Sequence, residues 1–377
     1  MLKQWSVPCL LLGISALRCV HAQTPAAASK PGSDVLIFVD GEKLIGHLKS
    51  ATGSSVVFKS DMAGDVTVEW SKIQELRSSE KFAVIPKSAK LRKSEDTSNV
   101  PQGTIAMTDQ KIEVIPAAQA APQTVPLGNA SNVVDEAAFQ KAFTRSSFLG
   151  GWKGGATVGA SLTEATQKNQ SFSAALNMVR AVPGVNWLDL RSRTIFDYNE
   201  AYGKLTTPGS PAIKTSLYHV DAEQDWYLSP RLFAFVSAAF DHNFSQGLKL
   251  QQTYGGGAGL VVVKESSREL DFKGSADYID QQFEVPGLDK KLIGSIFSET
   301  YVEKFAHGIL FNQQGGIIPA WNNTNAYSAF ASAGLTFPVY HRFGLTLGAL
   351  DNFLNDPPPG FKKNSLQFTL GATYSFQ

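Results

Sequence analysis

The sequence predicts an all-β protein: an antiparallel transmembrane β-barrel of about twelve strands, preceded by a small SH3-like or Sm-like β-domain. Three observations predict this class. The chain begins with an export segment, its C-terminal region alternates apolar and polar residues over many consecutive runs, and the connections between those runs alternate in length. Each of these observations excludes a different group of alternatives.

The N-terminus has the three parts of a secretory signal peptide. Lys3 precedes the apolar stretch VPCLLLGISAL, and small residues follow at Val20 and Ala22. We predict a signal peptide over residues 1–22, with cleavage after Ala22. Cleavage there removes both cysteines, so disulfides, cysteine metal sites and cysteine nucleophiles are not expected in the mature chain.

The charge balance argues against a nucleic-acid partner. The chain has 34 Lys and Arg residues against 33 Asp and Glu residues, and no block of basic residues. A basic surface is the electrostatic signature of nucleic-acid binding. No run of apolar residues is long enough for a membrane-spanning helix, which needs about 20 of them.

A small periplasmic β-domain is predicted over residues 33–115. Short runs that favour strands alternate with turn signals through residues 34–78, and Asp40-Gly41 is a strong hairpin dipeptide. About five strands in so short a segment are typical of a small barrel. His47 lies on one of these hairpins, and we interpret it as a solvated residue.

The next segment, residues 116–147, is predicted to be a linker that contains one short helix. Its first part is rich in Ala, Pro and Gln, a composition typical of flexible connections. A helix is predicted over residues 133–143, because acidic residues stand in its first turn and Phe139 and Phe143 lie four positions apart on one face.

The membrane barrel is predicted over residues 148–377. In the closing stretch NSLQFTLGATYSFQ, every second residue from Leu366 to Phe376 is apolar, and the intervening residues are small or polar. A period of two belongs to a strand with two different faces. Alternation alone fits a soluble sandwich as well as a lipid-facing barrel.

The connections favour the barrel. Long connections such as LTEATQKN, AYGKLTTPGSPAIK and FLNDPPPGFKK alternate with short ones such as PGVN, SP and PVYH. Outer-membrane barrels have long loops at one end and short turns at the other, and an even number of strands.

Charged residues inside the predicted strands share the face opposite the apolar one. In a membrane barrel this face lines the lumen. These charges could form a salt-bridge network that fills a narrow lumen, or they could line a conducting path. The candidate lumen-lining residues are Asp189, Arg191, Arg193, Asp197, His219, Asp221, Glu223, Asp225, Glu269, Asp271, Lys273, Glu299 and Glu303.

The segment FQKAFTRSSFLGGWKGGATVGASLTEATQKNQSFSAALNM has a Gly-rich strand with a Trp-x-Gly start and then a polar and aromatic strand. With its aromatic last strand, the region 133–377 resembles the uncharacterised family of salt-induced outer-membrane β-barrel proteins. The resemblance implies an outer-membrane barrel and supplies no catalytic residues. Family members usually end on an aromatic residue, whereas here Gln377 follows Phe376.

The leading functional hypothesis is an outer-membrane barrel that serves as a small-solute pore or as a structural, stress-related envelope protein. An exported soluble all-β binding protein and a lipase-like barrel enzyme are the alternatives. His219 with Asp221, and His242 within Asp-His-Asn, could orient a nucleophile, but no G-x-S-x-G or H-E-x-x-H motif occurs. We therefore expect no enzyme, cofactor or metal. The expected partners are outer-membrane lipid, the barrel-assembly machinery and an unidentified periplasmic partner of the N-terminal domain.

Overall fold

The computed structural model describes residues 32–91, 94–116, 121–144, 150–164 and 167–376. The predicted signal peptide lies outside these residues. The chain divides into two compact units: residues up to Phe82 together with Gln102–Val133, and Ala83–Pro101 together with the chain from Val134 onward. No helix in the described part of the chain is long and apolar enough to cross a membrane.

The N-terminal strands form one nine-stranded sheet, and five of its strands begin within residues 34–78, as predicted. Its order is β4-β3-β2-β1-β5-β6-β7-β8, and β9 pairs with both β2 and β5. The strands are β1 (Asp34–Phe38), β2 (Lys43–Thr52), β3 (Ser55–Ser60), β4 (Gly64–Glu69), β5 (Ile73–Pro86), β6 (Gln102–Thr108), β7 (Lys111–Ile115), β8 (Gln123–Pro126) and β9 (Ala130–Asp135). Short 3-10 helices are η1 (Trp70–Lys72), η2 (Ser94–Asn99) and η3 (Leu127–Asn129).

The core of this sheet follows from the two-residue alternation of its strands. Leu36, Val56, Phe58 and Leu76 are completely buried, because alternate residues of a strand point to the same face. The predicted hairpin dipeptide is also present. Gly41 has a φ of +88°, a conformation that glycine adopts without a steric penalty.

The predicted linker is wrong over much of its length. Residues 123–126 and 130–135 form β8 and β9 of the sheet, and helix α1 is confined to Glu136–Phe143. The Ala-, Pro- and Gln-rich composition of this segment is typical of a flexible connection. Two short strands form here because neighbouring strands of the sheet pair with them. Helix α1 starts where the Asp135 carboxylate accepts a hydrogen bond from the Ala138 amide at 2.8 Å, which caps the first turn.

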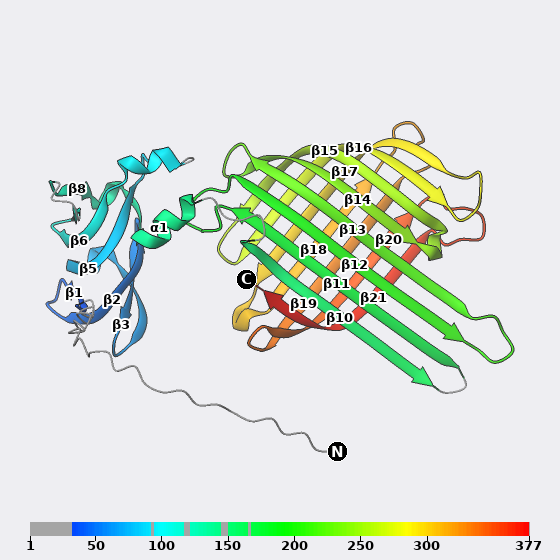
Figure 1. Ribbon diagram of the computed structural model, residues 1–377, viewed down its shortest axis with the longest axis horizontal. Helices are drawn as coiled ribbons and strands as arrows, with labels where there is room; N and C mark the ends of the chain where they lie inside the picture. The colour runs from blue at the N-terminus through cyan, green and yellow to red at the C-terminus, as the bar shows by residue number, and fades with distance from the viewer. Residues whose placement is uncertain (1–31, 92–93, 117–120, 145–149, 165–166, 377) are drawn as a thin grey trace, which may run out of the picture. The chain divides into compact units, whose positions relative to one another are not determined.

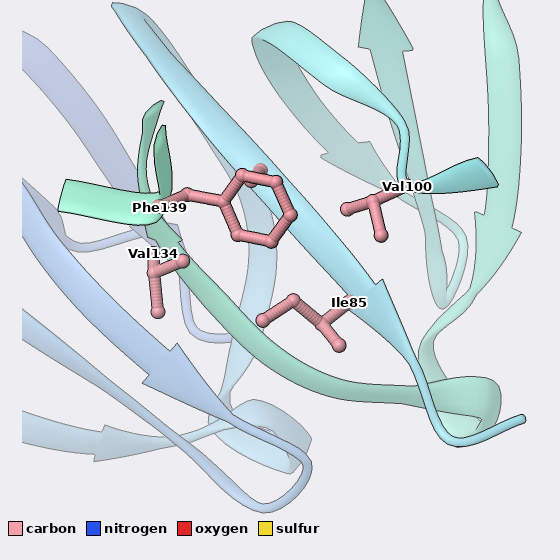
Figure 2. Close-up of a cluster of buried hydrophobic side chains, with 5 residues drawn as sticks. Ile85, Val100, Val134 and Phe139 are labelled. Carbon is pink, nitrogen blue, oxygen red and sulfur yellow. The ribbon is translucent and has the colours of Figure 1, made fainter. Parts of the chain in front are cut away.

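Helix α1 contributes to a buried apolar cluster that Figure 2 shows in close-up. Phe139 is fully buried against Ala83, Ile85, Val100 and Val134. The ring of Phe143, one turn further on, lies 5.1 Å from that of Phe139. The predicted pair of phenylalanines on one helix face is therefore confirmed, and its partners are the end of β5 and the start of the helix segment.

The remaining strands close into the predicted twelve-stranded antiparallel barrel (Figure 1). They are β10 (Trp152–Glu164), β11 (Lys168–Val182), β12 (Ser192–Thr206), β13 (Ile213–Tyr227), β14 (Leu232–Asn243), β15 (Leu248–Lys264), β16 (Arg268–Phe283), β17 (Lys290–Lys304), β18 (Leu310–Ile318), β19 (Ser328–Tyr340), β20 (Phe343–Leu354) and β21 (Asn364–Phe376). Two further 3-10 helices, η4 (Phe244–Gln246) and η5 (Ala306–Gly308), lie in connections.

The last strand closes the barrel on the first, as predicted. Thr157 of β10 lies opposite Thr373 of β21, and their hydroxyls are 2.8 Å apart. Phe368 on the apolar face is 76 % exposed, whereas Thr373 on the polar face is 7 % exposed. The apolar face therefore points outward and the polar face points into the lumen.

The outer surface is a band of apolar and aromatic side chains. Val158, Leu162, Val236 and Phe297 are each exposed on it. In water such a continuous apolar surface would be unfavourable, and in lipid it is required. The two-sheet soluble alternative is therefore wrong, because the strands form one closed barrel rather than two packed sheets.

Aromatic residues at the strand ends differ in where they point. Trp226 and Tyr340 are exposed on the outer surface, as an interfacial belt requires. Tyr227 is buried instead. As the neighbour of an outward residue in a strand, it points into the lumen.

The alternation of connection lengths is weaker than predicted, because the strands extend into the predicted loops. Strand β10 runs to Glu164 and β11 begins at Lys168, so most of LTEATQKN is strand. Conversely, the predicted short turn PGVN is part of the longer connection 183–191. Strand β15 has 17 residues, whereas crossing a bilayer needs about 9–11. Several strands therefore continue beyond the hydrocarbon layer.

Candidate functional site in the barrel lumen

Most of the charged residues in the lumen lie on one part of its wall, strands β12 to β16. Arg193 of β12 contacts Glu269 and Asp271 of β16, four strands further around the barrel. A contact between strands this far apart in the ring is possible only through the interior of the barrel. Residues that the strand register places on the same face as these three therefore line the lumen.

Nine of the thirteen candidate residues share this lumen face. They are Arg193, Asp197, His219, Asp221, Glu223, Asp225, Glu269, Asp271 and Lys273. Asp189 and Arg191 lie in the connection 183–191 before β12 and not in a strand. The structure also places Asp241 and Asp277 on the lumen face, because they lie opposite His219 and Gly255 in the register.

Glu299 and Glu303 point outward, so their lumen assignment is wrong. Glu299 lies opposite Phe272, an exposed residue of the outer face. Its carboxylate accepts a hydrogen bond from the Gln313 amide at 2.6 Å. Both faces of β17 mix apolar and polar residues, so the sequence pattern gives no direction, and only the register with β16 decides it.

Arg193 is the centre of the charged wall. Its guanidinium donates to Asp225 at 2.6 Å, to Asp271 at 2.9 Å and to Glu269 at 3.2 Å. The side chain of Asp225 is fully buried, and that of Arg193 is 12 % exposed. Charge-assisted bonds of this kind are the strong ones, and the planar guanidinium is suited to several carboxylates at once.

Two aromatic rings also lie close to the Arg193 guanidinium. The guanidinium carbon lies 5.2 Å from the centre of the Phe233 ring and 5.9 Å from that of Tyr227. Phe233, Tyr227, Phe235 and Val261 form a buried cluster, at the lumen end where β13 meets β14. This end of the lumen is therefore packed with side chains next to the charged wall.

A second ion pair crosses the lumen from β16 to β13. The Lys273 ammonium donates to both oxygens of Glu223, at 2.8 and 3.0 Å. Their side chains are 13 % and 7 % exposed. Lys273 also lies 5.5 Å from the centre of the Phe235 ring. The two crossing pairs hold β12, β13 and β16 together.

His219 lies further along the same wall, between two carboxylates. Its Nε2 is 2.9 Å from Asp221 and its Nδ1 is 2.6 Å from Asp241. Asp197 lies opposite Asp221 and accepts a hydrogen bond from the Asn177 amide at 2.5 Å. Here carboxylates are in excess over cations, and their side chains are partly exposed to the interior.

Glycines of β15 make room for the charged wall, a role that the alternation of polar and apolar residues does not predict. A Cβ at Gly259 would lie 2.1 Å from the Phe233 ring, and one at Gly255 would lie 1.8 Å from the Asp277 carboxylate. Both glycines face the lumen in the stretch YGGGAG. Glycine at alternate positions within a strand was the available signal that bulky groups approach it closely.

The opposite part of the wall is lined with hydroxyl groups. The hydroxyls of Thr336, Thr346, Thr373 and Thr157 form a continuous chain, with separations of 2.9, 2.5 and 2.8 Å. These residues come from β19, β20, β21 and β10. The lumen therefore has a charged wall, on which the cross-lumen ion pairs are formed, and a hydroxyl-lined wall.

One end of the lumen is crossed by a connection. Residues 355–363 join β20 to β21, and the Gln246 amide donates to the carbonyls of Asn352 and Lys363 at 2.9 and 2.8 Å. The Lys362 amide donates to the Ser245 carbonyl at 3.0 Å. Strands β15 and β21 lie six strands apart in the ring, so these bonds join opposite walls.

Apolar side chains reinforce this crossing. Leu248, Phe283 and Leu354 form a buried cluster from β15, β16 and β20. A Cβ at Gly247 would lie 2.8 Å from the Phe361 ring, so the ring of the crossing segment rests on the opposite wall. We call residues 355–363 the crossing segment. The lumen is thus narrowed at this end and packed beside Arg193 at the other.

Neither histidine pair has the arrangement of a nucleophile-activating base. Both ring nitrogens of His219 are within hydrogen-bond distance of carboxylates. His242 is on the outer face, where its Nδ1 lies 2.9 Å from the Lys249 carbonyl and its ring stacks on Tyr218.

Comparisons with known proteins match this region. A family model described as "Protein of unknown function, DUF481" matches residues 156–376. An outer membrane channel from Pseudomonas putida F1 is 12 % identical with a TM-score of 0.35, over 61 % of this chain and 97 % of that chain. The translocator domain of the autotransporter NalP from Neisseria meningitidis is 9 % identical with a TM-score of 0.33, over 64 % and 93 %.

The β-domain of the Bordetella autotransporter BrkA is 10 % identical with a TM-score of 0.30, over 60 % of this chain and 98 % of that chain. No curated protein matches the chain. At these low identities and TM-scores, no residue's role is transferred from the solved structures.

Proposed function

The chain belongs to the family described as "Protein of unknown function, DUF481". For this member of the family we propose that the barrel is an outer-membrane channel for small solutes that favours cations over anions. The observation that carries this proposal is the composition of the charged wall. The cations Arg193, Lys264 and Lys273 are outnumbered by lumen-facing carboxylates on β12 to β16: Asp197, Asp221, Glu223, Asp225, Asp241, Glu269, Asp271 and Asp277. Rings of carboxylates select for cations in pores.

The carboxylates that govern selectivity are those outside the Arg193 and Lys273 ion pairs. Asp197 and Asp221 lie opposite each other, and Asp241 lies opposite His219. Their charge is only partly compensated by the single imidazole between Asp221 and Asp241. In a narrow lumen the surrounding wall of low dielectric focuses this negative potential, which attracts cations and repels anions.

The topology supports an orientation in the membrane. In an antiparallel barrel with an even number of strands, the first strand starts at the end where the last one finishes, and Gly154 of β10 is paired with Phe376 of β21. We place this end, and hence the N-terminal sheet, on the periplasmic side. The crossing segment then faces the cell exterior. Outer-membrane lipid and the barrel-assembly machinery remain the proposed partners.

A structural envelope role is the second candidate, and the cross-lumen ion pairs favour it. Arg193 and Lys273 join strands that are not neighbours, and this stiffens the barrel whether or not anything passes through. The proposal includes no catalytic step, because both nitrogens of His219 are engaged and His242 is on the outer face.

Ion selectivity in planar bilayers tests the channel. With a KCl gradient across the purified protein, the reversal potential should have the sign of potassium permeation. In the double variant Asp197→Asn/Asp221→Asn it should shift toward zero, because two lumen carboxylates outside the Arg193 and Lys273 ion pairs are removed. Glu200→Gln is the matched control, since Glu200 is on the outer face of β12 and bonds to Tyr198. A protein that inserts but conducts nothing above background would sink the channel and leave the structural role.

A further inference from the structure

Three side chains with metal-binding atoms converge in the N-terminal sheet. Asp34 opens β1, His47 is in the middle of β2, and Glu80 is in β5. One oxygen of each carboxylate and one ring nitrogen of the histidine all lie within 4.8 Å of one another. The strands that carry them are neighbours, since β1 pairs with both β2 and β5. The antiparallel register therefore brings together residues that are far apart in the sequence.

Asp34 is held rigidly in this cluster. Its carboxylate is 1 % exposed, and its two oxygens accept hydrogen bonds from the amides of Leu48 and Ser79 at 2.8 and 3.1 Å. These amides belong to residues next to His47 and Glu80 in the sequence. A carboxylate oriented by such bonds keeps a free lone pair on each oxygen, which is how outer-shell bonds orient metal ligands.

The relation between His47 and Glu80 is unusual for an ion pair. Nδ1 of His47 lies 3.4 Å from Oε1 of Glu80, and it is a buried atom that makes no hydrogen bond to any described residue. A charge-assisted N–H···O bond would be about 2.7–2.9 Å long. The His47 side chain is 39 % exposed, but this ring nitrogen is buried and unpaired, so its lone pair is available to a ligand that the carboxylates share.

The geometry points to a divalent transition-metal ion, and we propose that Asp34, His47 and Glu80 bind Zn²⁺. Bonds of about 2.0–2.1 Å to nitrogen and oxygen in a tetrahedron separate neighbouring ligand atoms by about 3.4 Å, the separation of His47 and Glu80. Imidazole nitrogen and carboxylate oxygen are both ligands of Zn²⁺, and a water molecule would complete the four. The sequence expectation that His47 is only solvated and that no metal binds is replaced by this proposal.

A metal at this position would fasten the first strand of the sheet. Asp34 is close to the beginning of the described chain, where the Ser79 hydroxyl also donates to the Gly32 carbonyl at 2.8 Å. A bound ion would tie β1 to β2 and β5 at once, and it would stabilise the folded sheet by an amount that rises with the logarithm of its concentration relative to its dissociation constant. This inference is independent of the channel proposal.

Metal content and affinity of the untagged full chain test the site. The protein in detergent is equilibrated with Zn²⁺ alone, and bound metal is measured by mass spectrometry. One Zn²⁺ per chain is expected in the wild type. His47→Gln and Glu80→Gln remove a direct ligand, so each should weaken binding by more than about 100-fold, which is the upper range for loss of an outer-shell partner. Asp34→Asn is avoided, because this residue also orders two backbone amides.

The matched control is Asp65→Asn. This carboxylate is exposed in the same sheet and pairs with Lys49 outside the cluster, so Zn²⁺ binding should be unchanged. Circular dichroism checks that each variant is folded. A measurement on the wild type needs no variant: Zn²⁺ should protect His47 from chemical modification by diethyl pyrocarbonate, while the exposed His307 stays reactive. No bound Zn²⁺, equal binding by His47→Gln, or an unprotected His47 would each overturn the proposal.

Discussion

Arg193 of β12 and Asp271 of β16 are joined by a 2.9 Å hydrogen bond across the lumen, although three strands separate them along the barrel wall. Asp271 is 3 % exposed, so neither water nor ions reach it easily. A bond between non-neighbouring strands fixes the shape of the barrel cross-section. It makes Arg193 the residue on which the charged wall depends.

Replacement of Arg193 should destabilise the barrel strongly. Arg193→Met keeps much of the volume but leaves Asp225 and Asp271 buried without their cation, and breaking a buried pair typically costs about 3–5 kcal/mol. The midpoint of the heat-induced shift in gel migration should fall. Arg268→Met is the control, because Arg268 is exposed and pairs only with Glu265 in a turn; it should change little. Equal midpoints for the two variants would contradict the role of Arg193.

Loss of the bonds to the crossing segment should loosen that end of the lumen. Gln246→Ala removes both hydrogen bonds that the amide makes to opposite strands. We expect faster tryptic cleavage after Lys362 and Lys363 and, if the barrel conducts, a larger single-channel conductance. Gln252→Ala on the outer face of β15 is the control. Unchanged cleavage would show that Gln246 does not hold the segment.

A methyl group at Gly259 should be poorly tolerated. The added Cβ would lie 2.1 Å from the ring of Phe233, a fully buried residue, and overpacking of this kind costs about 1–3 kcal/mol. The free energy of unfolding in urea should fall by that amount. Gly274→Ala is the control, since its nearest neighbour would be at an ordinary contact distance of 3.5 Å. Adding Phe233→Leu to Gly259→Ala should restore part of the loss; no recovery would argue against the steric cause.

An arginine introduced into β21 should impair membrane insertion on the outer face and be tolerated on the lumen face. Leu370→Arg places a charge on the outer surface, where Leu370 is 58 % exposed, at a cost of about 2–4 kcal/mol near the bilayer centre. Gln367→Arg in the same strand places the charge on the lumen face. Folding into lipid vesicles, followed by the migration of folded and unfolded bands, should show poor insertion only for the first variant. Equal insertion of both would contradict the assignment of the faces.

Strands β16 and β17 differ in how far their sequences predict the lumen face. In β16 Glu269, Asp271, Lys273 and Asp277 share one parity, so this face could be predicted from alternation. In β17 both sets of alternate residues mix apolar and polar side chains. The prediction from alternation therefore places Glu299 on the wrong face. Only the pairing of Glu299 with the outward Phe272 corrects it. The local sequence pattern predicts which face of a strand points into the lumen only where the two faces differ in polarity.

By itself the sequence determined the number of barrel strands and the lumen-facing residues of β12 and β13, because a period of two is a local property of the chain. The tertiary structure alone decided which charges meet. Arg193 and Asp271, Gln246 and Lys363, and Asp34, His47 and Glu80 come together through register and barrel closure. These are relations between distant segments, and no window of neighbouring residues contains them.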